Sequence, residues 1–130
     1  MALGGLMNLS ITTGSNLAIY EQIVQQIKNE IIAGHLTEGD MLPSIRSLAK
    51  ELQISVITTK RAYEELEKEN LVYTVAGRGV FIARQDKKIL REKKITGIES
   101  SLTELIRESK KAGLSKEDLT EMVQLLWEEE

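Results

Sequence analysis

Cysteine is absent from the 130 residues, and histidine and proline occur once each. Without cysteine the chain can form neither a disulfide nor a thiolate nucleophile. A single histidine, His35, is a poor basis for a metal site, so we expect no metal and no cofactor. A Gly-rich phosphate loop is also missing, and paired carboxylates occur only inside helical charge runs. We therefore do not expect an enzyme.

Long hydrophobic runs are missing too. No uncharged apolar stretch approaches the roughly 20 residues that span a bilayer. The opening residues lack the basic start of a signal peptide. We therefore expect no membrane contact and a cytoplasmic location. Residues 1–6 are interpreted as an alternative start or a cloning remnant.

The net charge of −3 is unevenly distributed. Residues 95–130 carry 4 basic and 9 acidic side chains, or −5, which leaves 13 basic and 11 acidic, or +2, over residues 1–94. Because nucleic acid responds to local charge, an acidic whole is compatible with a basic face.

Two short amphipathic segments lie back to back in the middle of the chain. Apolar residues recur at helical spacing over 44–52 and again over 56–69, behind the candidate N-caps Ser44 and Ser55. Only two residues remain to turn the corner, which is the tight connection of a helix-turn-helix. A longer helix is predicted before them over 17–33, capped by Ser15 or Asn16.

A β-hairpin is predicted directly after these helices. Strands over 71–75 and 80–82 flank Ala76-Gly77-Arg78-Gly79, whose glycines permit a tight turn with Arg78 projecting outward. A helix-turn-helix with such a hairpin is a winged helix. The fold class is therefore mainly α with a small β-hairpin, and the winged-helix domain is expected over residues 7–83.

The tail, residues 84–130, is predicted to be a two-helix dimerisation hairpin. Six basic and two acidic residues over 84–94 come first, and a heptad seam follows them. A second helix begins near Ser115. Tail helices on the scale of 11 residues cannot form a stable core alone, so we expect the seams to pair in a homodimer. The dimerisation residues are Ile95, Ile98, Leu102, Leu105, Leu119, Met122, Val123 and Leu126.

The chain resembles a known family in three places. Residues 32–46, 61–67 and 77–81 are similar to signatures of GntR-type bacterial transcription regulators, and the Ala62-Tyr63 pair with the start at 19–23 resembles the YtrA-like subfamily. The resemblance implies a repressor that binds an inverted-repeat operator in double-stranded DNA as a homodimer. It also implies DNA contacts by Arg46, Lys60 and the wing-tip Arg78.

The segment 56–69 carries its charges unevenly, with basic residues early and four glutamates late. Only its first two turns can therefore enter the major groove. The family often has arginine just after the Ser55 position, where this chain has Val56-Ile57. Such apolar side chains contact thymine methyl groups and shift the expected preference toward A·T. The predicted DNA site comprises Ser44, Arg46, Ser55, Ile57, Thr58, Lys60, Arg61, Gly77, Arg78 and Gly79.

Two alternatives stay open at this point. A winged helix can serve as a protein-interaction module whose acidic tail is the working surface. It can also be a small-molecule sensor with weak DNA affinity, and two tails in a dimer can enclose a pocket for an unidentified effector.

Overall fold

The computed structural model describes residues 9–129, and the expectation for residues 1–6 lies outside that range. The chain divides into two compact units, one ending at Leu90 and one beginning at Arg91, which are treated separately below. This division falls after the domain boundary that we predicted at Ala83. The described elements are α1 (Ile19–Ala33), α2 (Ile45–Leu52), α3 (Val56–Lys68), β1 (Val72–Val75), β2 (Gly79–Ile82), α4 (Lys87–Lys111) and α5 (Lys116–Trp127).

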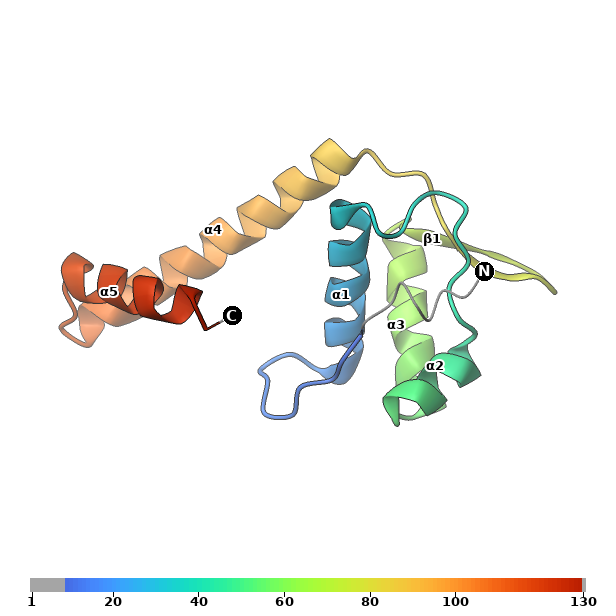
Figure 1. The fold of residues 1–130 in the computed structure, drawn as a ribbon, viewed down its shortest axis with the longest axis horizontal. Coiled ribbons are helices and arrows are strands. Elements are labelled where there is room, and N and C mark those ends of the chain that lie inside the picture. Colours follow the sequence, from blue (N-terminus) through green and yellow to red (C-terminus); the bar gives the residue numbers. More distant parts are fainter. Residues whose placement is uncertain (1–8, 130) are drawn as a thin grey trace. The chain divides into compact units, whose positions relative to one another are not determined.

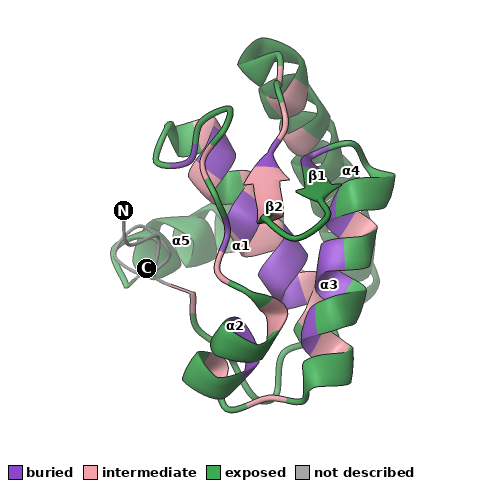
Figure 2. Ribbon diagram, turned by 90° about the vertical axis from the view of Figure 1, so that its right-hand side faces the viewer, coloured by how far each residue is buried: buried purple, intermediate pink, exposed green. Residues whose placement is uncertain are grey.

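The first unit is a winged helix, as predicted. Both α1 and α2 pack against α3, and the antiparallel β1–β2 hairpin follows α3 (Figure 1). Buried residues lie on the inward faces of these elements (Figure 2). Burying each such side chain stabilises the fold by about 1.5–3 kcal/mol. The largest fully buried side chains include Ile23, Ile27, Ile31, Leu36, Leu48, Leu66 and Ile82.

The ends of the helices follow local chemistry at most positions. Gly34, at φ 84°, ends α1 as predicted, and Asn70 takes a left-handed φ of 60° after α3. Our expectation for the start of α1 was wrong, because Ala18 occupies the N-cap position. The hydroxyl of Ser15 instead accepts from the N–H of Leu17 at 3.1 Å, so it is engaged before the helix begins.

Residues 9–12 are held against α1 by two glutamines one turn apart. The Gln22 carboxamide accepts from the N–H of Thr12 at 2.9 Å and donates to its carbonyl at 3.1 Å. Gln26 makes the same pair of bonds with the backbone of Ser10, at 3.0 and 2.7 Å. The side chains of Leu9 and Ile11 pack against the core. The glutamines thus act on this segment as a neighbouring strand would.

The tail contains a longer helix than we predicted. We expected helices of about 11 residues, but α4 runs for 25 because it begins in the basic run. Asp86 supports this early start, since its Oδ1 accepts from the N–H groups of Lys88 and Ile89 at 3.0 and 3.3 Å. Good helix formers follow, and the helix continues through Gly97.

The helix α5 begins at the predicted Ser115 with a capping box. Ser115 Oγ accepts from the N–H of Asp118, and the Asp118 carboxylate accepts from the N–H of Ser115. Hydrogen bonding to the carboxylate, first from the Ser115 backbone N–H and then from the Ser115 side chain, holds the pKa of Asp118 below its ordinary value. The shorter aspartate therefore serves in place of the usual glutamate.

Candidate nucleic-acid interface

The start of α2 is fixed from two sides. Ser44 Oγ accepts from the N–H of Ser47 at 3.1 Å, which caps the helix and places Arg46 in its first turn with an exposed side chain. From α3, the buried Tyr63 hydroxyl donates to the carbonyl of Pro43 at 2.7 Å. Burial raises the pKa of Tyr63, so the hydroxyl stays protonated and remains a donor. The tyrosine therefore joins the two helices at the point where Arg46 projects.

The start of α3 is capped in a similar way. Ser55 Oγ accepts from the N–H of Thr58 at 3.0 Å and donates to the Thr58 hydroxyl at 2.8 Å. The Thr59 hydroxyl is buried and donates to the carbonyl of Ser55 at 3.1 Å. Ile57 and Lys60 lie on the opposite, exposed face of the helix. The predicted residues at the start of α3 are thus brought together on one helix end, part as caps and part as exposed side chains.

Arg61 has a partner that sequence reasoning missed. Its guanidinium lies 3.9 Å from the centre of the Tyr20 ring on α1, and its Nη2 donates to the Tyr20 hydroxyl at 3.3 Å. A cation over an aromatic face is held there electrostatically. Nothing in the sequence spacing pairs these residues, which lie 41 positions apart. Arg61 therefore links α3 to α1, in addition to its predicted place in the DNA site.

The acidic end of α3 lies against α1 and the wing. Lys28 Nζ on α1 is 2.7 Å from Glu69 Oε1, and the Thr74 hydroxyl on β1 donates to Glu67 at 3.5 Å. Glu65 and Glu69 line a shallow groove between α1 and α3. Positive and negative charge therefore occupy opposite ends of the same helix, as the sequence predicted.

The wing is joined by a short segment from before α2. Met41 pairs with Phe81, and the N–H of Leu42 donates to the Val80 carbonyl at 2.8 Å, so this segment adds a short edge to the hairpin. At the turn, Gly77 has φ 74° and Gly79 has φ 136°, both in the region that favours glycine. Arg78 between them is exposed.

We expect Arg78→Ala to weaken DNA binding while leaving the thermal melting curve unchanged, because the exposed side chain has DNA as its proposed contact. Gly79→Val should instead destabilise the hairpin by more than about 1 kcal/mol, since a β-branched residue is strained at positive φ. A Cβ at Gly79 would also lie 3.3 Å from the sulfur of Met41. Thermal melting and DNA affinity, measured on both variants, separate the two effects. Unchanged affinity for Arg78→Ala across a salt series would remove the wing tip from the interface.

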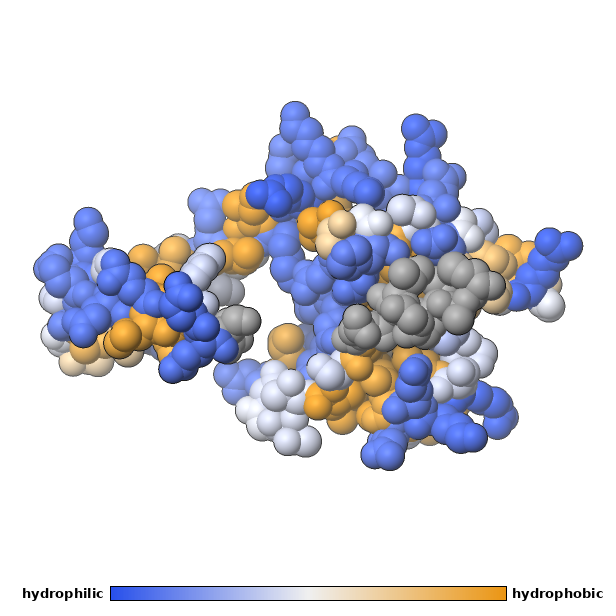
Figure 3. All heavy atoms as spheres, viewed as in Figure 1, coloured by the Kyte–Doolittle hydropathy of each residue, from blue (hydrophilic) through white to orange (hydrophobic). Residues whose placement is uncertain are grey.

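In the second unit, the predicted dimerisation residues remain open to solvent. Neither α4 nor α5, both described in full, contains a buried residue. Leu119 is half-buried, and the other seven residues of the predicted set are exposed. Hydrophobic atoms accordingly reach the surface of both helices (Figure 3). The single chain therefore leaves its heptad seam uncovered.

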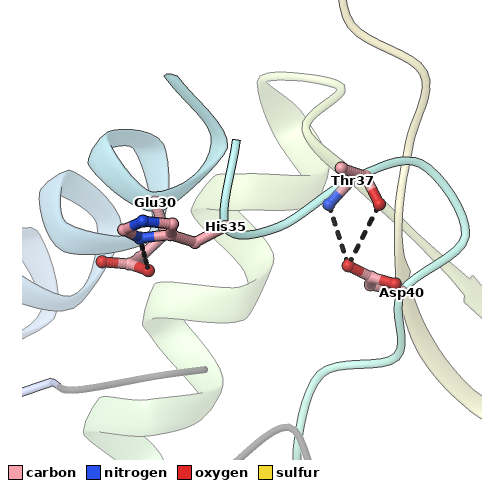
Figure 4. Close-up of polar contacts among 4 residues, drawn as sticks. All are labelled: Glu30, His35, Thr37 and Asp40. Atoms are coloured by element: carbon pink, nitrogen blue, oxygen red, sulfur yellow. Dashed lines mark hydrogen bonds and ion pairs between the residues drawn. The ribbon is translucent and has the colours of Figure 1, made fainter. Parts of the chain in front are cut away.

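Other candidate sites find little support. His35 lies after α1, where its Nδ1 is 2.9 Å from Glu30 Oε2, and Asp40 accepts from the N–H of Thr37 at 2.9 Å (Figure 4). Over residues 9–129, no group of three or more metal-ligating side chains is placed to hold an ion. Every helix in the same range is too short or too polar to cross a membrane.

Comparison with known proteins identifies relatives that match most of the chain. A family model described as "Bacterial regulatory proteins, gntR family" matches residues 19–82. The chain is 39% identical over 115 residues to the HTH-type transcriptional repressor YtrA of Bacillus subtilis (strain 168), and the match covers 88% of each chain. Such a match extends beyond the winged helix into the tail.

Solved structures show the same similarity. A GntR family transcriptional regulator from Listeria monocytogenes superposes with a TM-score of 0.64 at 38% identity, covering 85% of this chain and 96% of that one. AraR(DBD), solved in complex with operator ORE1, has a TM-score of 0.50 at 27% identity and covers 58% of this chain and 95% of that one.

Proposed function

This chain belongs to the GntR family of bacterial regulatory proteins, with YtrA among its relatives, and from that premise we propose that it represses transcription as a homodimer on an inverted-repeat operator. DNA binding is the general activity of such regulators. Because the bacterial chromosome lies in the cytoplasm, the chain works there. A small-molecule effector in a pocket between the two tails of the dimer stays a prediction.

The observation that carries this proposal is the concentration of exposed positive groups at the starts of α2 and α3. Arg46 and Lys60 are exposed within the first two turns of their helices. Helix N-termini attract phosphate through their free N–H groups and dipole. At these two helix starts, that attraction adds to the attraction of the basic side chains for the DNA backbone. The relative AraR(DBD) was solved with an operator, which supports the same role for this surface.

The homodimer rests on the open seam of the tail. The exposed residues Ile95, Ile98 and Leu102 follow the spacing of a coiled coil, and a second copy would cover them. A two-fold pair of winged helices presents two recognition helices to successive major grooves, which requires an operator of matching symmetry. The inverted repeat follows from this symmetry.

The dependence of affinity on salt tests the proposal against a protein-interaction module. We would select DNA from a random pool with the full chain and measure its binding by fluorescence anisotropy. If two subunits each place Lys60 and Arg78 on phosphates while Arg46 contacts a base, affinity should fall roughly 10²-fold from about 50 to about 200 mM salt. Failure to enrich any sequence, or a flat salt dependence, would contradict operator binding.

A further inference from the structure

The N-terminal end of α3 exposes an apolar side chain at a position where residues that contact bases usually have a hydrogen-bond donor. Ile57 is 81% exposed, more than any other large hydrophobic side chain that the structure describes. Its neighbour Val56 is also exposed. Because the stabilisation from an apolar side chain scales with the area it removes from water, a side chain left this open contributes little to the core. The folded unit itself therefore gives Ile57 no packing role.

The polar groups around Ile57 are already engaged. The Ser55 hydroxyl bonds to Thr58, and the Thr59 hydroxyl bonds to the Ser55 carbonyl. The Arg61 guanidinium lies on Tyr20. Lys60, one turn along the same face, is then the exposed charged donor nearest to Ile57, and Arg61 next to it is held toward α1 by Tyr20. Few side-chain donors at the N-terminal end of α3 are therefore available to hydrogen-bond a base. Apolar contact is accordingly expected to contribute more to the base preference.

Resting on the proposed function, we propose that Ile57 reads the 5-methyl group of a thymine in the major groove, so that each half-site carries an A·T pair there. Thymine alone among the four bases presents a methyl group in the major groove. Guanine presents two acceptors, and an alkyl side chain against them would leave both without a hydrogen bond. Ile57 thus favours thymine by contact and disfavours guanine by desolvation.

Removing the methyl group from the DNA tests this contact directly. In the duplex selected from a random pool, each thymine is replaced singly by deoxyuridine, which deletes the methyl group and keeps the base pair. With the natural chain, we expect one position in each half-site to lose affinity about fourfold, the value for one buried methyl-sized group. With Ile57→Ala, the same replacement should cost nothing, while thermal melting stays unchanged because the side chain is exposed.

Two further variants sharpen the result. Ile57→Arg should change the selected base at that position from thymine to guanine, because arginine bonds both acceptors of guanine. Ile89→Ala, which truncates another exposed isoleucine, is the matched control and should retain the full uracil effect. Equal uracil sensitivity in the natural chain and Ile57→Ala, or none at any thymine, would overturn the inference and leave operator binding standing. If no DNA is selected at all, operator binding fails and the inference falls with it.

Discussion

Leu102→Asp is expected to convert the dimer to a monomer and to lower operator affinity by roughly 10²–10⁴-fold, the gain that linking two half-site binders provides. Leu102 lies in the middle of the seam and is 46% exposed in the single chain. In a dimer this position would be buried, where an unpaired carboxylate is strongly disfavoured. The winged helix should stay folded, because Leu102 belongs to the second unit.

Ultracentrifugation gives the oligomeric state. The ratio of the affinities for the full repeat and for one half-site gives the gain that dimerisation provides. Ser100→Asp is the matched control, since it adds the same charge at an exposed position on the helix face opposite the seam. The variant at Leu102 should bind a single half-site as well as the natural chain does. A natural chain that is monomeric and binds both DNAs equally well would contradict the dimer.

Arg46→Ala should cost about 1–3 kcal/mol of specific binding at each half-site and relax the preference at one base position, if the guanidinium pairs with a base edge. The side chain is exposed on a helix start that Ser44 and Tyr63 fix in place. Its loss therefore removes a preorganised contact without disturbing the fold. Competition binding with single-base variants of the selected DNA measures both effects.

Two variants test whether this loss is specific. Arg46→Lys keeps the charge but loses the planar fork, so it should retain salt-dependent affinity and still lose base preference. Lys68→Ala, at the far end of α3, should change binding little. If Lys68→Ala proved as damaging as Lys60→Ala, the proposed docking of α3 by its first two turns would be wrong.

The winged helix could be predicted because its signals are local. The serines at 44 and 55 cap helices in the structure as they were expected to, and apolar spacing located the buried face of α3. The left-handed φ values of Asn70 and of the wing glycines follow from residue type, whereas Gln53, which ends α2 at φ 58°, carries no such signal. Each of these features depends on neighbours within a few positions, so no knowledge of the tertiary fold was required.

Contacts between distant segments could not be predicted in the same way. The edge pairing of Met41 with Phe81 and the Arg61–Tyr20 contact depend on where other elements come to rest. The hold of Gln22 and Gln26 on the backbone of residues 9–12 is invisible to hydrophobic patterning, because it uses carboxamides and main-chain atoms. The length of α4 is a different case. The cap at Asp86 before Lys87 is a local signal, but the basic run carries no apolar spacing that joins it to the seam as one helix.

The charge gradient along α3 bears on how a regulator finds its site in a genome. A helix that were basic throughout would lie along any stretch of duplex, and the genome offers about 10⁶–10⁹ such competing stretches. Glu64, Glu65 and Glu67 in the second half of α3, which Lys68 offsets only in part, would repel phosphate in that lengthwise pose, so nonproductive encounters are expected to dissociate sooner. If α3 docks by its first two turns as proposed, the acidic end would thereby shorten the time spent on wrong DNA, a kinetic effect that adds nothing to the affinity for the operator itself.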